Sequence, residues 1–110
     1  MKQAPITLTK DIIRESALKE LRLRGYECWR QNNIAVRGRK FIGRRGVSDI
    51  IGFTLRDSCC RWVVCEVKTL NDKLSDDQKQ FLNDIKNSGG MAYLAIQKGN
   101  QVAVVEWEGK

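Results

Sequence analysis

Residues 61–69 constrain the fold of this chain more tightly than any other segment. Read as a β-strand, the segment places alternate side chains on opposite faces: Trp62, Val64, Glu66 and Lys68 on one, and Val63, Cys65 and Val67 on the other. Glu66 and Lys68 then stand about 7 Å apart, from a rise of about 3.3 Å per residue. Because burying an unpaired charge is costly, a charged pair in an otherwise apolar strand predicts a functional cluster.

A second strand is expected over residues 47–54, joined to the first by a turn over residues 55–59. If the two strands form an antiparallel hairpin centred between Asp57 and Ser58, Asp49 lies opposite Glu66. Their Cβ atoms would then be about 5 Å apart on one face. Two carboxylates this close repel each other unless a cation or a proton lies between them.

Oxygen ligands without histidine or thiolate suit Mg²⁺ or Mn²⁺, and the backbone carbonyl of Val67 is a further candidate ligand. The alternative is a surface ion pair between Lys68 and Asp49 or Glu66, which contributes about 0–1 kcal/mol. The clustering of all three charges favours the metal site.

Basic residues are segregated in the chain, whose net charge is +7. Residues 28–48 contain no acid, and their six basic residues are Arg30, Arg37, Arg39, Lys40, Arg44 and Arg45. Such a local positive field predicts nucleic-acid binding, although a solvated loop would have the same composition.

The chain has no histidine, which excludes Ser-His-Asp triads, Cys-His dyads and histidine-metal nucleases. Its four cysteines include no C-x-x-C pair, so we expect reduced, structural thiols rather than zinc ligands. The 110 residues predict one domain, 1–110. Without a secretory signal or an apolar run of about 20 residues, we expect a cytoplasmic protein and no membrane partner.

The remaining elements follow from periodicity and capping signals. An amphipathic helix is expected over residues 9–24, with Ile12, Ile13, Ala17, Leu18 and Leu21 in its apolar stripe and Thr9 as N-cap. A second helix runs from Asp76 to Asn87 after Ser75, and strands are expected at 26–31, 91–97 and 101–107. The order is α-β-β-β-α-β-β, a mixed β-sheet flanked by helices in the α/β class.

Asp49 followed by Glu66-Val67-Lys68 resembles the PD-(D/E)XK nuclease signature, with Ser48 where proline often precedes the aspartate. The chain is also similar to the VRR-NUC (virus-type replication-repair nuclease) family over residues 13–96. That resemblance rests on Glu15-Ser16, residues 26–30 with Asn32, residues 46–52 and 66–69, residues 74–81 with Gln78, and Gly89-Gly90.

The resemblance implies a restriction-endonuclease-like core that hydrolyses phosphodiester bonds with Mg²⁺ or Mn²⁺. It implies that the metal ligands are Asp49, Glu66 and the Val67 carbonyl. Lys68 would orient the attacking water or offset the negative charge that develops in the transition state. Glu15 would be the helix-borne acid of the family and would reach the metal directly or through water, although Glu20 competes for that role and a solvated glutamate is the alternative. Gln78 either serves a capping box with Ser75 or points into the site.

The family further implies a viral or prophage protein in the host-cell cytoplasm that works as a homodimer on four-way or other branched DNA. No small-molecule cofactor is expected. Two alternatives remain open: an inactive nucleic-acid-binding module, and a restriction-type, nicking or RNA-directed nuclease of the same superfamily. No base-reading element can be identified in the sequence.

Overall fold

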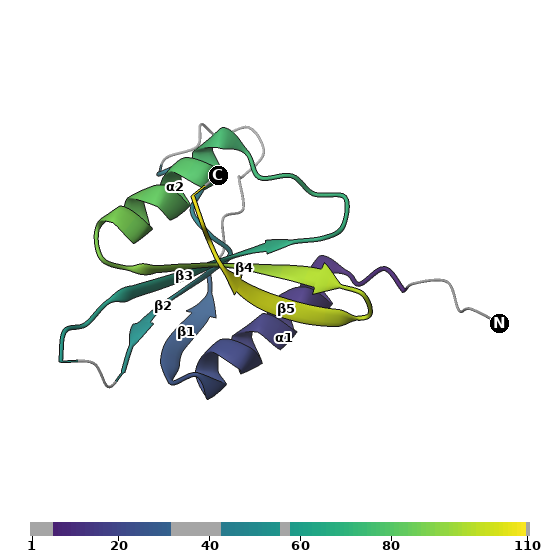
Figure 1. The fold of residues 1–110 in the computed structure, drawn as a ribbon, viewed down its shortest axis with the longest axis horizontal. Helices are drawn as coiled ribbons and strands as arrows, with labels where there is room; N and C mark the ends of the chain where they lie inside the picture. Colours follow the sequence, from purple (N-terminus) through teal and green to yellow (C-terminus); the bar gives the residue numbers. More distant parts are fainter. Residues whose placement is uncertain (1–5, 32–42, 56–57, 110) are drawn as a thin grey trace.

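A five-stranded sheet lies between two helices in the computed structural model of this chain, which describes residues 6–31, 43–55 and 58–109. Figure 1 shows the sheet nearly edge-on, with one helix on each face. The elements follow the predicted order: α1 (Lys10–Leu23), β1 (Tyr26–Arg30), β2 (Ile50–Thr54), β3 (Trp62–Lys68), α2 (Asp76–Asn87), β4 (Met91–Lys98) and β5 (Gln101–Glu106).

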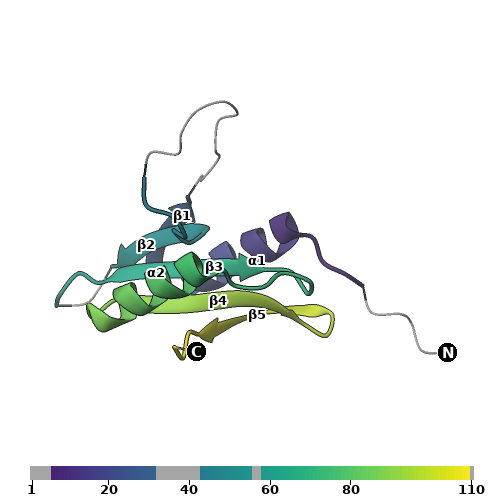
Figure 2. The same ribbon diagram turned by 90° about the horizontal axis from the view of Figure 1, so that it is seen from above.

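The strands lie in sequence order across the sheet, as Figure 2 shows from above. Neighbouring strands are antiparallel except β3 and β4, which are parallel and are joined through α2. In the β2–β3 pair, Ile50 lies opposite Cys65 and Ile51 opposite Val64. This is the register expected from the sequence, and it brings Asp49, just before β2, to the level of Glu66.

The two faces of β3 follow the predicted alternation. Val63, Cys65 and Val67 pack under α1, whereas Val64 packs under α2 with Phe81 and Leu82. Glu66 shares the α2 face and is only 2% exposed. The fold therefore buries a carboxylate in the layer between the sheet and α2.

Helix α1 begins after its predicted N-cap, Thr9, whose side chain accepts a hydrogen bond from the Ile12 backbone N–H. Its stripe differs from the expectation at one position. Ile12 is exposed, and Arg14 is buried with Ile13 and Ala17 instead. The stripe is rotated because Arg14 precedes Leu18 and Leu21 by four and seven residues, the spacings that share a helix face.

Two of the cysteines also depart from expectation. Cys28 and Cys65 are buried, as expected of structural thiols, but Cys59 and Cys60 are exposed in the connection between β2 and β3. All four are free thiols. No helix in the described part of the chain has the length and apolar character needed to span a membrane.

Candidate active site

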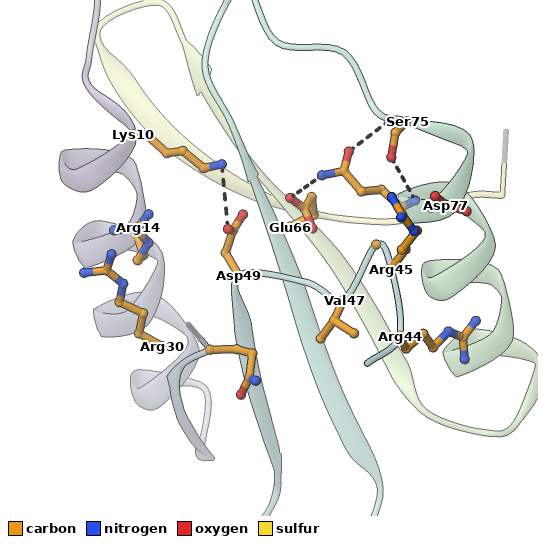
Figure 3. A pocket seen from close by; sticks show the side chains of 13 residues that line it. Lys10, Arg14, Arg30, Arg44, Arg45, Val47, Asp49, Glu66, Ser75 and Asp77 are labelled. Carbon is orange, nitrogen blue, oxygen red and sulfur yellow. Dashed lines mark hydrogen bonds and ion pairs between the residues drawn. The ribbon is translucent and has the colours of Figure 1, made fainter. Parts of the chain in front are cut away.

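An open cavity of about 550 Å³ lies at the end of the sheet where β2 begins and β3 ends. Figure 3 shows Asp49 and Glu66 between side chains that come from α1 and from α2. The lining consists of these two carboxylates, a third one from Asp77, five cationic side chains and five other residues: Lys10, Arg14, Arg30, Gln31, Arg44, Arg45, Gly46, Val47, Asp49, Glu66, Ser75, Asp77 and Gln78.

Asp49 is fixed by its hydrogen bond to β3. Its Oδ2 accepts from the Val67 backbone N–H at 3.0 Å, and its Oδ1 lies 3.7 Å from the Lys10 ammonium. The bond to Val67 also explains why β2 begins at Ile50 and not at residue 47. A side-chain oxygen takes the β3 donor, so the backbone ladder ends there.

Glu66 is held from one side only. Its Oε1 accepts from Gln78 Nε2 at 3.2 Å, whereas Oε2 is buried with no hydrogen-bond partner among the described residues. A buried carboxylate oxygen without a donor is unfavourable unless a proton or a cation satisfies it.

The surroundings of Glu66 favour its protonated form when no cation is bound. Burial is the largest cause, and the neighbouring Asp49 carboxylate adds to it; together they raise the pKa of Glu66 to about 9, although the positive charges of Lys68 and Lys10 oppose the shift. At neutral pH this carboxyl group therefore holds a proton, which a divalent cation would displace.

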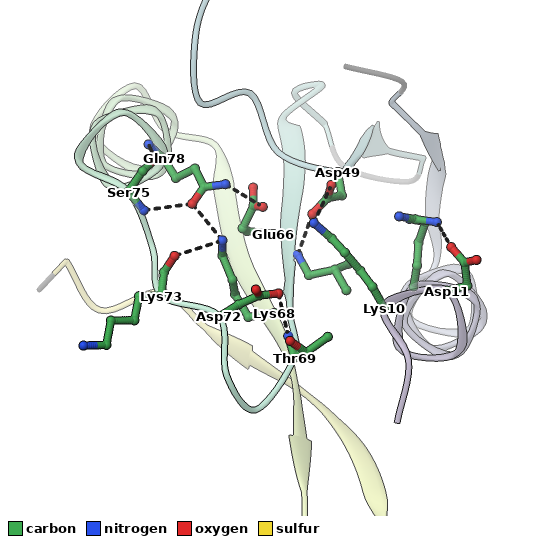
Figure 4. A network of polar contacts seen from close by, with 12 residues as sticks. Lys10, Asp11, Asp49, Glu66, Lys68, Thr69, Asp72, Lys73, Ser75 and Gln78 are labelled. Carbon is green, nitrogen blue, oxygen red and sulfur yellow. Dashed lines mark hydrogen bonds and ion pairs between the residues drawn. The ribbon is translucent and has the colours of Figure 1, made fainter. Parts of the chain in front are cut away.

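Lys68 lies at the end of β3, where Gln78 holds it. Its Nζ donates to Gln78 Oε1 at 2.8 Å and to the Lys73 carbonyl at 3.2 Å. Gln78 also closes a capping box with Ser75 at the start of α2. Figure 4 shows this network from Ser75 to Glu66. Both arrangements expected for Gln78 are therefore present at once.

Glu15 does not join the carboxylate pair. It is exposed on α1 and does not line the cavity. Helix α1 contributes Lys10 and Arg14 instead, which are four residues apart on one face, while Glu15 is rotated about 100° from Arg14. Neither cation was predicted from the sequence, although their spacing after the N-cap Thr9 was an available signal.

The predicted basic segment is described in part. Arg30, Arg44 and Arg45 line the cavity, whereas Arg37, Arg39 and Lys40 lie outside the described residues. Arg44 forms an ion pair with Asp84, and its guanidinium carbon lies 5.1 Å from the centre of the Phe81 ring. These contacts attach the segment before β2 to α2.

The donor set fits a hard divalent cation. Two facing carboxylates, one with an unsatisfied oxygen, offer the oxygen ligands that Mg²⁺ and Mn²⁺ prefer. Within the described residues, no group of three or more Asp, Glu, Cys or His side chains is arranged to hold a metal ion. A bound ion would therefore take its remaining ligands from backbone, water or substrate.

Comparison with known proteins supports the fold and gives the family. No curated protein sequence matches the chain. Among solved structures, it is similar to Hjc from Archaeoglobus fulgidus, a Holliday junction resolvase of an archaeal hyperthermophile. The TM-score is 0.56 at 21% identity, over 87% of this chain and 75% of Hjc.

The likeness to Hjc confirms the expected fold, a restriction-endonuclease-like α/β core. The VRR-NUC domain matches residues 7–97, which is most of the chain and contains Asp49, Glu66, Lys68 and Gln78. The chain therefore belongs to the VRR-NUC family of nucleases.

Proposed function

We propose that this protein is an endonuclease that hydrolyses DNA phosphodiester bonds with Mg²⁺ or Mn²⁺. The observation that carries the proposal is the carboxylate pair: the buried Glu66 has an oxygen without a partner among the described residues, and the partly buried Asp49 faces it from the position just before β2. Lys68, at the end of the strand that carries Glu66, completes the arrangement.

Asp49, Glu66 and the Val67 carbonyl are the proposed ligands. The bound cation would polarise the phosphate and lower the pKa of a water molecule. Gln78 and the Lys73 carbonyl occupy two of the three donors of the Lys68 ammonium, which leaves one for the attacking water or a phosphate oxygen. The fixed positive charge would stabilise the negative charge that develops in the transition state.

The cationic lining supports a polyanionic substrate. Arg30, Arg44 and Arg45 border the cavity, and Arg37, Arg39 and Lys40 complete the proposed binding segment. Branched DNA, such as a four-way junction, is the proposed substrate, since Hjc has the same fold and is a Holliday junction resolvase. Among the described residues the cavity is open to solvent, which would let a phosphodiester backbone reach the carboxylates.

The test compares linear, flapped and four-way DNA, and RNA of the same sequence, with Mg²⁺, Mn²⁺ or EDTA. We expect metal-dependent cleavage, most rapid on the junction. Asp49→Asn and Glu66→Gln should abolish cleavage and keep DNA affinity, because the basic residues supply the affinity. From its exposure, Glu15→Gln should cleave at the wild-type rate.

The alternatives predict different results. Binding without cleavage under all conditions would indicate an inactive nucleic-acid-binding module. Cleavage by Asp49→Asn at the wild-type rate would contradict the assignment of the ligands. Equal cleavage of linear and branched DNA would leave a nicking or restriction-type nuclease.

A further inference from the structure

Arg14 is a buried arginine for which the carboxylate pair gives no explanation. It is 7% exposed, and it lies on α1 among the apolar residues that pack against the sheet. Even so, it borders the same cavity as Asp49 and Glu66. A guanidinium group remains charged at any pH that proteins encounter, so its burial requires anionic or hydrogen-bonding partners.

The partners of Arg14 are incomplete. Its Nη1 donates to Asp11 Oδ1 at 2.7 Å, but the Asp11 side chain is 82% exposed, and water screens such a pair. Its Nε is buried and has no hydrogen-bond partner in the described part of the chain. A buried N–H donor without an acceptor destabilises the free protein. An acceptor that entered the cavity and bonded to Nε would remove this cost.

Two further cations border the cavity on the same side. Lys10 precedes Arg14 by one helical turn, and Arg30 ends β1. Figure 3 shows all three on the α1 side of Asp49, opposite Arg44 and Arg45 on the α2 side. The side of the cavity next to α1 is therefore cationic. Asp49 is the lining carboxylate that contacts it, through Lys10.

We propose that Arg14, with Lys10 and Arg30, forms a phosphate-binding subsite that holds a backbone phosphate of the nucleic acid beside the one that is cleaved. Arginine suits this ligand because its planar group donates two parallel hydrogen bonds to phosphate oxygens, one of them here from Nε. The subsite rests on the proposed function, since it assumes a nucleic-acid strand across the carboxylate pair.

The Arg14 Nε–H group offers a direct test by NMR, because a buried guanidinium N–H exchanges slowly enough to observe. The signal is assigned from its loss in Arg14→Lys. Wild-type protein is titrated in EDTA with a short DNA duplex and, separately, with inorganic phosphate. We expect the Arg14 signal to shift and to saturate at the DNA concentration that saturates binding, while the Arg22 signal stays in place.

Affinity measurements supply the second test. Fluorescence anisotropy in EDTA should show about tenfold weaker DNA binding for Arg14→Lys, the effect expected when a charge-assisted bidentate contact is lost. Lys10→Gln, at a half-exposed position, should weaken binding by about threefold. Lys19→Gln removes one charge from the exposed side of the same helix and should change affinity least.

Asp11→Asn separates this subsite from a structural role for Arg14. If Asp11 competes with phosphate for Nη1, its removal should tighten DNA binding. If the ion pair merely positions Arg14 in the fold, its removal should weaken binding and lower the melting temperature, and that result would overturn the inference. An Arg14 signal that does not move at saturating DNA, whether or not inorganic phosphate moves it, would overturn it as well.

None of these measurements depends on cleavage. Failure of cleavage with an intact Arg14 response would therefore count against the proposed hydrolysis alone. Metal-dependent cleavage without an Arg14 response would count against the subsite alone.

Discussion

Lys68 is the residue whose role is most open to direct measurement. Its ammonium group is held at 2.8 Å from Gln78 Oε1 and 3.2 Å from the Lys73 carbonyl. We expect Lys68→Met to lower single-turnover cleavage by about 10²-fold, the scale for losing one transition-state stabiliser. DNA and metal affinity should change little.

The matched control for Lys68 is Lys73→Met. It removes a neighbouring exposed charge and leaves the backbone carbonyl that Lys68 contacts. It should cleave normally. If both variants lose activity equally, the effect would reflect the local field and not the position of the Lys68 ammonium.

Glu66 makes stability depend on pH. Its folded-state pKa is raised to about 9 from an ordinary 4.5, mainly by burial and then by Asp49. The folded protein thus keeps a proton that the unfolded chain releases. The resulting stability is full below pH 4.5 and is lost as pH rises toward 9.

We therefore expect the melting temperature of the metal-free protein to fall between pH 5 and pH 9 more steeply than that of Glu66→Gln. Millimolar Mg²⁺ should reduce the fall in the wild type only, because the cation binds the deprotonated pair. Parallel melting curves for the two proteins across this range would contradict the assigned protonation.

Strand alternation and the hairpin register were enough to predict where Asp49, Glu66 and Lys68 lie, whereas the N-cap Ser75 left two arrangements open for Gln78. The period of two is strict along a strand, so a single register determines every side chain. The side chains of α1 that face the cavity were harder to predict, because an error of one residue along a helix rotates a side chain by about 100°. That rotation separates the exposed Glu15 from Arg14, which lines the cavity.

At the scale of elements, the β2–β3 register could be read from the turn that joins the strands, but the start of β2 could not. Asp49 bonds to the Val67 N–H through its side chain, and no propensity rule distinguishes that from a continued ladder. The exposure of Cys59 and Cys60 depends likewise on where β3 begins, at Trp62. The pairing of β2 with β3 was therefore predictable from the sequence, whereas the ends of the two strands depend on tertiary contacts.

Gly46 determines how the segment before β2 meets α2. Its φ is +81°, and a Cβ at this position would lie 2.3 Å from the Asp77 backbone carbonyl. We expect Gly46→Ala to displace the segment that leads into Asp49 and so to lower both the melting temperature and cleavage.

Gly25→Ala is the control for Gly46→Ala. Gly25 has a similar φ of +95°, but a Cβ there meets no atom within 4 Å. It carries the backbone strain without the clash. If Gly25→Ala reduced cleavage as much as Gly46→Ala, the contact with α2 would have no particular role.

At the scale of the molecule, a symmetric homodimer is the arrangement we expect on a four-way junction. The junction has two-fold symmetry and needs paired cuts, whereas one domain has one carboxylate pair. Ile50 and Trp107 are buried in the core and are unsuitable for such an interface. Trp62 is 59% exposed and Val105, on the edge strand β5, is 36% exposed.

Light scattering should give twice the monomer mass for the free protein, and the mass of two protomers plus the junction for the complex. Trp62→Arg should restore the monomer if this surface forms the contact, and Leu55→Arg, at another exposed apolar position, should not. A monomer in both states would remove the basis for paired cuts.

Position 78 accepts fewer residue types than its place in the helix alone would require. A capping box accepts either glutamate or glutamine at its third helical position. Only the amide can donate to Glu66 while it accepts from Lys68 and from the Ser75 backbone N–H. A relative with glutamate here would begin its second helix normally but would set a third acid against Glu66. Variation at this position is therefore restricted by the cavity and not by the helix.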